Sequence, residues 1–241
     1  MPAKIFKRPA AVSTDLFTPA ALTTVDVMKF NFLLCYALLA LYAPFAHSLE
    51  SRTLLVVGDS ISAGYGIQRE EGWVSLLSQA LLEREEPWRV INASISGETT
   101  GGGLARLPAL LREHTPALVI IELGGNDGLR GYPIGKMREN LSAMVQQVQQ
   151  QQAVALLVAM RIPPNYGPRY TDAFERVYAD VAAHLDAALV PFLLDRVALE
   201  DGLMQADGIH PTAAAQPLLL EAVWTYLEPL LVVEESAGDG E

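Results

Sequence analysis

Two short segments near opposite ends of the chain carry side chains that could together hydrolyse an ester. Residues 54–60 read Leu-Leu-Val-Val-Gly-Asp-Ser, so Ser60 follows an apolar run that is typical of a buried strand. Residues 207–211 read Asp-Gly-Ile-His-Pro, which puts Asp207 and His210 three positions apart on one loop. A serine hydroxyl becomes an effective nucleophile when a histidine takes its proton and a carboxylate orients that histidine. The three residue types therefore predict a Ser60–His210–Asp207 triad.

Each of these residues also has a plain structural interpretation. Ser60 could cap the segment that follows the strand, and residues 207–210 could form a turn before the last helix. The other histidines after residue 48 are weaker candidates, since His114 ends one predicted helix and His184 lies inside another. His210 is therefore the preferred base. Position 62 is a serine, which argues against the Gly-x-Ser-x-Gly nucleophile elbow.

Two glycine-containing loops could supply the hydrogen-bond donors that acyl transfer requires. Gly97, in the Ser-Gly-Glu sequence of residues 96–98, can offer an unobstructed backbone N–H. Asn126, in the Gly-Gly-Asn-Asp sequence of residues 124–127, can offer a side-chain amide. The alternative for both is an ordinary turn residue. Together with the backbone N–H of Ser60, they predict an oxyanion hole made of Ser60, Gly97 and Asn126.

The remaining sequence predicts an α/β fold that would bring these loops together. Nearly continuous apolar runs, typical of strands buried on both faces, alternate with segments of helical periodicity, which indicates a parallel sheet. The expected strands are Thr53–Val57, Arg89–Asn92, Ala117–Leu123, Val154–Met160 and Leu189–Leu194. Pro191 lies in the last of them, which is therefore expected at a sheet edge. Ligands bind at the carboxyl ends of such strands, and Ser60, Gly97, Asn126 and residues 160–161 each follow such an end by a few positions.

The first 48 residues are expected to lie outside the fold. Lys29 precedes an apolar run at residues 32–43, and Ala46 and Ser48 give a small-x-small end, so residues 28–48 have the features of a secretory signal peptide. That run is shorter than the roughly 20 residues that span a bilayer, although an uncleaved anchor is an alternative. Residues 1–27 are then hypothesised to precede the true start at Met28. This organisation predicts a periplasmic or secreted protein with one domain at 49–232 and an acidic, frayed tail at 233–241.

Composition limits the expected partners. The chain carries a net charge of −11, and residues 49–241 keep 13 basic and 26 acidic side chains, because four basic and two acidic residues precede them. This balance disfavours nucleic acid and anionic membrane surfaces. Cys35, the single cysteine, lies in the signal, so the mature protein would have no disulfide and no cysteine metal site. Lipid attachment at Cys35 is a weaker alternative, because Leu34 is bulky for such a site. We expect no stable membrane insertion after signal removal, and a monomer by default.

The four blocks Gly58-Asp59-Ser60, Gly97, Gly124-x-Asn126-Asp127 and Asp207-x-x-His210 resemble those of the SGNH, or GDSL, hydrolases. Residues 58–65, 92–99, 122–131 and 160–167, and residues 207–211 with 215–217, are similar to bacterial periplasmic acyl-CoA thioesterases, lysophospholipases and arylesterases of that family. The resemblance covers residues 52–230. It implies a flavodoxin-like three-layer α/β/α sandwich with a five-stranded parallel sheet of order 2-1-3-4-5. It also implies Ser60 as nucleophile, His210 as base, Asp207 as its orienter, and an oxyanion hole of Ser60, Gly97 and Asn126.

The same resemblance implies hydrolysis of fatty acyl thioesters, lysophospholipids and aryl esters, without a cofactor or a metal. The chain departs from the family pattern at Ile61, Gly66 and Glu98, which bears on the preferred acyl length. Glu122 ends the central strand as a potentially buried carboxylate whose partner the sequence does not identify. An apolar trough near Ser60 is expected from Leu123, Leu129, Tyr132, Pro133, Ile162, Pro163 and Pro164.

Other functions remain open at this point. A carbohydrate O-deacetylase on the same scaffold is the alternative within enzymes. Outside enzymes, the alternatives are a catalytically silent lipid- or glycan-binding module and a flavin-binding protein. The first loop offers only Ser60 and Ser62 as phosphate-binding hydroxyls, which disfavours flavin.

Overall fold

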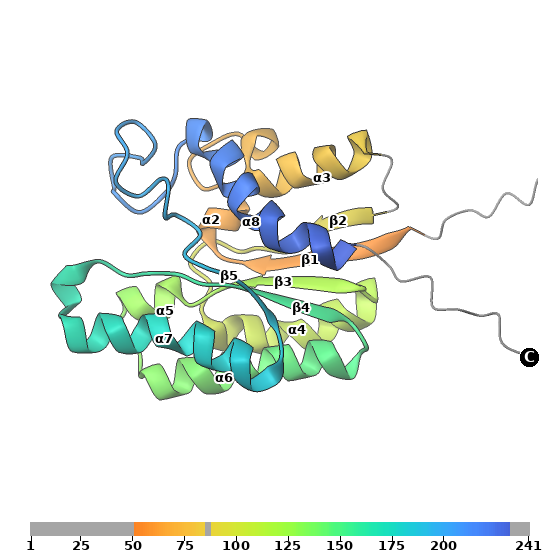
Figure 1. Cartoon of the computed structure of the whole chain (residues 1–241), viewed down its shortest axis with the longest axis horizontal. Coiled ribbons are helices and arrows are strands. Elements are labelled where there is room, and N and C mark those ends of the chain that lie inside the picture. Colours follow the sequence, from red (N-terminus) through yellow and green to blue (C-terminus); the bar gives the residue numbers. More distant parts are fainter. Residues whose placement is uncertain (1–50, 85–87, 232–241) are drawn as a thin grey trace, which may run out of the picture. The chain divides into compact units, whose positions relative to one another are not determined.

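The computed structural model describes residues 51–84 and 88–231 of the 241-residue chain (Figure 1). The predicted signal peptide at 28–48, the extension before it, Cys35 and the acidic tail at 233–241 all lie outside the described residues. The domain boundaries that depend on them stay predictions.

The centre of the fold is a five-stranded parallel sheet with the order β2-β1-β3-β4-β5, as predicted. Apart from Glu122, the residues of the central strand β3 are apolar, and all five are buried, because helices cover both faces of the sheet. The strands are β1 (Arg52–Gly58), β2 (Trp88–Asn92), β3 (Leu118–Glu122), β4 (Val154–Val158) and β5 (Ala188–Val190).

The last strand is shorter than expected. The predicted strand Leu189–Leu194 ends at Val190, where the regular register stops: the Ala159 N–H still donates to the Val190 carbonyl at 2.9 Å, but the next donor to the Ala159 carbonyl is the Leu193 N–H, at 3.2 Å. Its predicted place at a sheet edge is correct, since β5 pairs only with β4 within the described chain. The apolar residues after Pro191 instead form turns at the carboxyl end of the sheet, where the candidate site lies.

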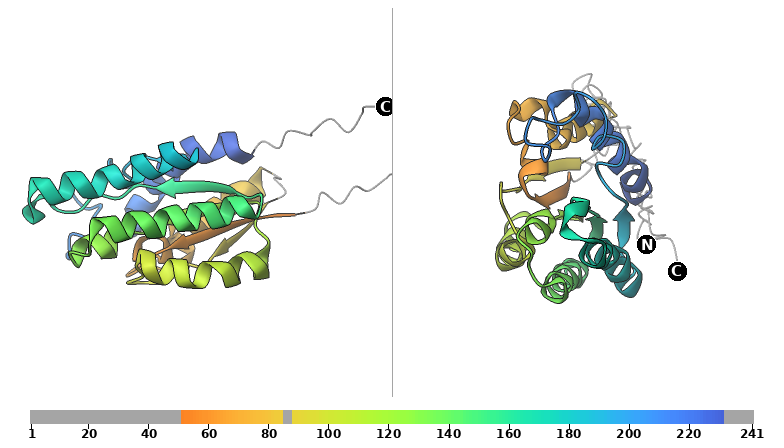
Figure 2. Two further views of the ribbon diagram at one scale, coloured as in Figure 1. Left: turned by 90° about the horizontal axis from the view of Figure 1, so that it is seen from below. Right: turned by 90° about the vertical axis from the view of Figure 1, so that its left-hand side faces the viewer.

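Helices form a layer on each face of the sheet, and the right-hand view of Figure 2 shows the sheet between them. Helices α3 and α8 pack together on one face, while α4, α6 and α7 pack side by side on the other. Their apolar stripes are buried against the sheet. The helices of these layers are α3 (Trp73–Glu83), α4 (Thr100–His114), α6 (Ile134–Gln150), α7 (Pro168–Leu185) and α8 (Gln216–Leu231).

Short helices and loops at the carboxyl end of the sheet carry the candidate residues, on the left in Figure 1. None of the described helices combines the length and apolar character needed to cross a bilayer. Within residues 51–84 and 88–231, no group of three His, Cys, Asp or Glu side chains is close enough to hold a metal ion. The short elements are α2 (Ser60–Ala63), α5 (Gly125–Leu129), and the 3₁₀ turns η1 (Arg69–Glu71), η2 (Pro164–Tyr166) and η3 (Ala213–Ala215).

Candidate active site

Ser60 stands at the tip of the central part of the sheet because β1 ends at Gly58 and α2 begins at Ser60. Asp59 is the N-cap of α2, since its Oδ1 accepts a hydrogen bond from the Ile61 N–H at 3.0 Å. The alternative interpretation, in which Ser60 caps this helix, is therefore wrong: Asp59 is the cap. A Cβ at position 58 would lie 2.7 Å from Glu122 Oε2, so this turn requires glycine.

The loop of residues 204–211 holds Asp207 and His210 in a fixed relationship. Asp207 Oδ1 accepts hydrogen bonds from the backbone N–H groups of Ile209 (2.9 Å) and His210 (3.0 Å). Its Oδ2 lies 2.7 Å from His210 Nδ1. The hydrogen bond to the His210 side chain, followed by those two backbone donors, lowers the pKa of Asp207 to about 2. The carboxylate is therefore ionised throughout the neutral range and is in a position to orient the imidazole.

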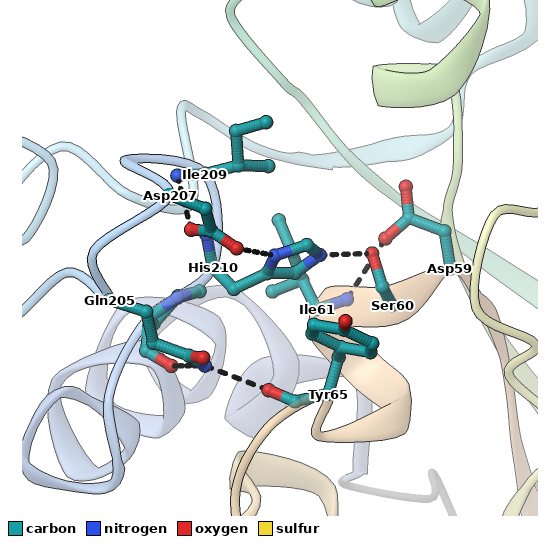
Figure 3. A network of polar contacts seen from close by, with 9 residues as sticks. Asp59, Ser60, Ile61, Tyr65, Gln205, Asp207, Ile209 and His210 are labelled. Atoms are coloured by element: carbon teal, nitrogen blue, oxygen red, sulfur yellow. Dashed lines mark hydrogen bonds and ion pairs between the residues drawn. The ribbon is translucent and has the colours of Figure 1, made fainter.

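The other imidazole nitrogen faces the serine. His210 Nε2 lies 2.9 Å from Ser60 Oγ, which joins residues 150 positions apart in the sequence (Figure 3). With the Nδ1 proton directed at Asp207, the free lone pair of Nε2 can take the proton of the Ser60 hydroxyl. The structure thus brings the three predicted residues into one hydrogen-bonded chain that can activate a hydroxyl for attack on a carbonyl carbon.

The three predicted oxyanion donors lie on three loops at this end of the sheet. Ser60 is the first residue of α2, so its N–H has no acceptor in its own helix. Asn126, in the first turn of α5, donates one amide hydrogen from Nδ2 to Asp59 Oδ2 at 3.0 Å, which leaves its second amide hydrogen for a ligand. Gly97 is exposed, has a φ of +79°, and accepts a hydrogen bond from Arg130 Nη2 through its carbonyl at 3.2 Å. Of the three proposed donors, the Gly97 N–H is the one whose direction is fixed by the fewest contacts.

A buried polar network joins the Gly97 loop to the Asn126 loop, and sequence reasoning missed it. Thr100 follows the first loop, and its N–H donates to Asp127 Oδ2 at 2.9 Å. The Thr100 hydroxyl donates to Asp127 Oδ1 and accepts from Asn140 Nδ2 at 3.0 Å. All three side chains are buried. The sequence signal was Asp127 itself, an acid directly after Asn126 in a loop that is otherwise apolar or glycine.

Two buried acids, Asp59 and Glu122, lie next to the turn that carries Ser60. Glu122 is fully buried, and its Oε2 accepts hydrogen bonds from Ser62 Oγ (2.6 Å) and the Asp59 N–H (3.3 Å). These contacts supply the partners that the sequence did not identify. Burial, and next the charge of Asp59, raises the pKa of Glu122 well above its usual range. Burial is also the main cause that raises the pKa of Asp59 to about 6, against the Ile61 hydrogen bond that lowers it. We therefore assign Glu122 as the neutral member of the pair at neutral pH.

A cavity of about 580 Å³ opens beside the serine–histidine pair. Its wall includes Ser60, Asn126 and His210, and otherwise consists mostly of apolar side chains. Four residues of the predicted trough line it: Leu129, Ile162, Pro163 and Pro164.

The rest of the trough prediction needs correction. Leu123 is fully buried in the core, and Tyr132 and Pro133 are not among the lining residues. The opposite wall comes from residues 192–209, which sequence reasoning had partly assigned to the last strand. Its apolar members are Phe192, Leu194, Ala198, Leu199, Met204 and Ile209.

Comparison with known proteins extends these observations. The sequence profile of the GDSL-like lipase/acylhydrolase family matches residues 56–217. Esterase TesA of Pseudomonas aeruginosa is 56% identical over 197 residues, which cover 82% of this chain and 96% of that protein. The thioesterase 1/protease 1/lysophospholipase L1 of Escherichia coli K12 is 44% identical over 179 residues, covering 74% and 85%. A crystal structure of TesA matches with a TM-score of 0.73 at 57% identity, covering 75% of this chain and 100% of that one.

Proposed function

Since this chain belongs to the GDSL-like lipase/acylhydrolase family and is a hydrolase of carboxylic esters and thioesters, we propose that Ser60 is its nucleophile, His210 its general base and Asp207 the group that orients His210. The observation that carries this proposal is the continuous chain of contacts from Asp207 Oδ2 to His210 Nδ1 (2.7 Å) and from His210 Nε2 to Ser60 Oγ (2.9 Å), beside an apolar cavity.

The reaction proceeds in two steps. Ser60 Oγ attacks the carbonyl carbon of the substrate while His210 Nε2 takes the hydroxyl proton. The carbonyl oxygen becomes an oxyanion, which the N–H groups of Ser60 and Gly97 and the amide of Asn126 stabilise. The intermediate then collapses: the bond to the leaving alcohol or thiol breaks, and that group takes the proton from His210. An acyl group is left on Ser60.

Water completes the cycle. His210 removes a proton from a water molecule as its oxygen attacks the acyl carbon, and the second tetrahedral intermediate releases the carboxylic acid and restores the Ser60 hydroxyl. Asp207 remains ionised throughout, in keeping with its lowered pKa, and favours the imidazolium that forms in each step. No step requires a cofactor.

The cavity supports a fatty acyl group as the part of the substrate that is bound. Its wall is mainly aliphatic and aromatic beside Ser60, and its volume of about 580 Å³ is far more than an acetyl group needs. We therefore propose acyl-CoA thioesters, lysophospholipids and aryl esters as substrates. A carbohydrate O-deacetylase would require polar groups for the sugar, which this wall offers sparsely.

We further propose that the protein works in the periplasm or is secreted, as a monomer. The signal-like sequence of residues 28–48 supports this location, and the monomer is the default expectation. The strongly acidic charge of the remaining chain does not favour nucleic acid as a partner.

Fluorophosphonate labelling followed by peptide mapping tests the nucleophile directly. We expect one label on the peptide that contains Ser60, no label on that peptide in Ser60→Ala, and no turnover of nitrophenyl esters by that variant. A series of acyl lengths from acetate to palmitate should give kcat/KM values that rise with chain length. Labelling at another serine, or activity confined to acetate, would contradict the proposal.

A further inference from the structure

Gln205 makes hydrogen bonds to both loops that hold the proposed triad. Its backbone N–H donates to the carbonyl of His210 at 2.8 Å. Its side-chain Nε2 donates to the carbonyl of Pro211 at 3.0 Å and to that of Tyr65 at 2.8 Å. Two of these contacts hold the residues at and after His210, while the third reaches 140 positions back to the turn that follows Ser60. Figure 3 shows Gln205 below the imidazole, directed at Tyr65.

The contact with Tyr65 bears on His210 in a second way. The Tyr65 N–H donates to the carbonyl of Ser60 at 3.0 Å, so Tyr65 is part of the same turn as the serine. The Tyr65 ring packs against the His210 imidazole, with the ring centroids 4.5 Å apart and the planes inclined by 38°. By fixing the backbone of Tyr65, Gln205 therefore also fixes the side chain that covers one face of the imidazole.

Gly66 makes this contact possible. Its φ is +77°, and a Cβ at this position would lie 2.3 Å from Gln205 Oε1 and 2.9 Å from Nε2. A residue with a side chain here would displace the amide of Gln205, so Gly66 and Gln205 form a matched pair in this chain.

We propose that Gln205 is a positioning residue for the hydrolysis reaction: it clamps the His210 loop onto the Ser60 turn and so keeps His210 Nε2 within proton-transfer distance of Ser60 Oγ. The inference rests on the proposed triad. Gln205 lies beside the reacting atoms without touching them, and its effect passes through His210 and Tyr65. A shift of about 1 Å in such a pair can lower a rate on the order of 100-fold.

The first test is Gln205→Met, which keeps a similar side-chain length and removes the donor. We expect kcat for a nitrophenyl ester to fall about 10- to 100-fold, and the rate of fluorophosphonate labelling at Ser60 to fall by a similar factor, with KM little changed. Gln79→Met is the matched control, because Gln79 donates to Glu83 on the exposed face of α3, and it should leave kcat unchanged. If the Gln205 hydrogen bonds only stabilise the fold, Gln205→Met would lower the melting temperature and leave kcat per folded molecule unchanged.

The second test uses two glycines with the same backbone conformation. Gly66 and Gly202 both have a φ of +77°, but a Cβ at Gly202 meets nothing within 4 Å. Both alanine variants should lose stability through backbone strain, whereas only Gly66→Ala should lower kcat. Gly66→Ala and Gln205→Met should disrupt the same contact. The loss in kcat of the double variant Gly66→Ala/Gln205→Met should therefore be no larger than the larger of the two single losses. The comparison of Gly66→Ala with Gly202→Ala remains decisive if Gln205→Met folds poorly.

The outcomes separate this inference from the proposed function. Turnover by Ser60→Ala would overturn both. An inactive Ser60→Ala with wild-type kcat and labelling rate in Gln205→Met or Gly66→Ala would overturn the positioning role alone. Equal losses of kcat in Gly66→Ala and Gly202→Ala would also overturn it, since strain and not the clamp would then be the cause.

Discussion

Asp59 Oδ2 accepts a hydrogen bond from Asn126 Nδ2 at 3.0 Å, so the residue before the proposed nucleophile holds a proposed oxyanion donor. The same carboxylate caps α2 through its other oxygen. One buried side chain therefore sets both the start of the helix that presents Ser60 and the direction of the amide beside it. The proposed nucleophile and the proposed oxyanion donor are thereby linked through one side chain.

Asn126→Ala should lower kcat about 100- to 1000-fold and change KM little, because the amide acts on charge that develops only in the transition state. Steady-state kinetics on a nitrophenyl ester measure this effect. Asn165→Ala, at an exposed position of the 3₁₀ turn η2, is the matched control and should behave as the wild type. An equal rise of KM with constant kcat in Asn126→Ala would indicate ground-state binding instead.

The buried position of Asp59 predicts a stability change with pH. Its folded-state pKa of about 6 lies above the ordinary value of 3.8, so the folded state holds the proton more tightly. The free energy of unfolding should therefore fall as pH rises from about 4 to 6, by at most about 3 kcal/mol from this group. Urea denaturation of the wild type and Asp59→Asn across this range checks the sign. Stability curves that run parallel for the two proteins would refute it.

The fold was largely predictable because its signals are local. Continuous apolar runs predicted the strands. Pro191 correctly indicated a strand at the sheet edge, although β5 already ends at Val190. Ser60, Asp207 and His210 could be proposed from the sequence because few residue types perform this chemistry, and the structure places the three side chains in contact. Glu122, Asp127 and Gln205 were not assigned partners, because their roles depend on contacts between segments far apart in the chain. The sequence carries no period or spacing that records such contacts.

Asp207→Ala should lower kcat less than Ser60→Ala or His210→Ala, which remove the proposed nucleophile and the proposed base. The imidazole would lose the partner 2.7 Å from Nδ1, yet the contacts of the Gln205 loop would still hold the His210 backbone. A loss on the order of 100- to 10,000-fold is expected, measured by single-turnover kinetics. Because the pKa of Asp207 is about 2, its protonation should not produce an activity loss above about pH 4. A loss as large as that of Ser60→Ala would show that Asp207 does more than orient the base.

The link between Thr100 and Asp127 should contribute to the stability of the fold. Thr100→Val keeps the shape and removes the hydroxyl, which leaves Asp127 Oδ1 and an Asn140 amide hydrogen without their buried partner. A loss of about 1–3 kcal/mol in the free energy of unfolding is expected. Thr225→Val is the control, since Thr225 is an exposed threonine on α8. If the two variants are equally stable, the network does not join the loops as described.

The apolar wall of the cavity makes a prediction about acyl length. Leu199 lines this cavity, yet 96% of its side chain is exposed, so a long acyl chain would cover an apolar surface that a short one leaves in water. Leu199→Asp should therefore raise KM for a dodecanoyl ester several-fold and leave the acetyl ester unaffected, because only the long chain loses apolar contact. Leu82→Asp is the matched control: Leu82 is 76% exposed on α3 and does not line the cavity. Equal effects of Leu199→Asp on both esters would place the acyl chain elsewhere.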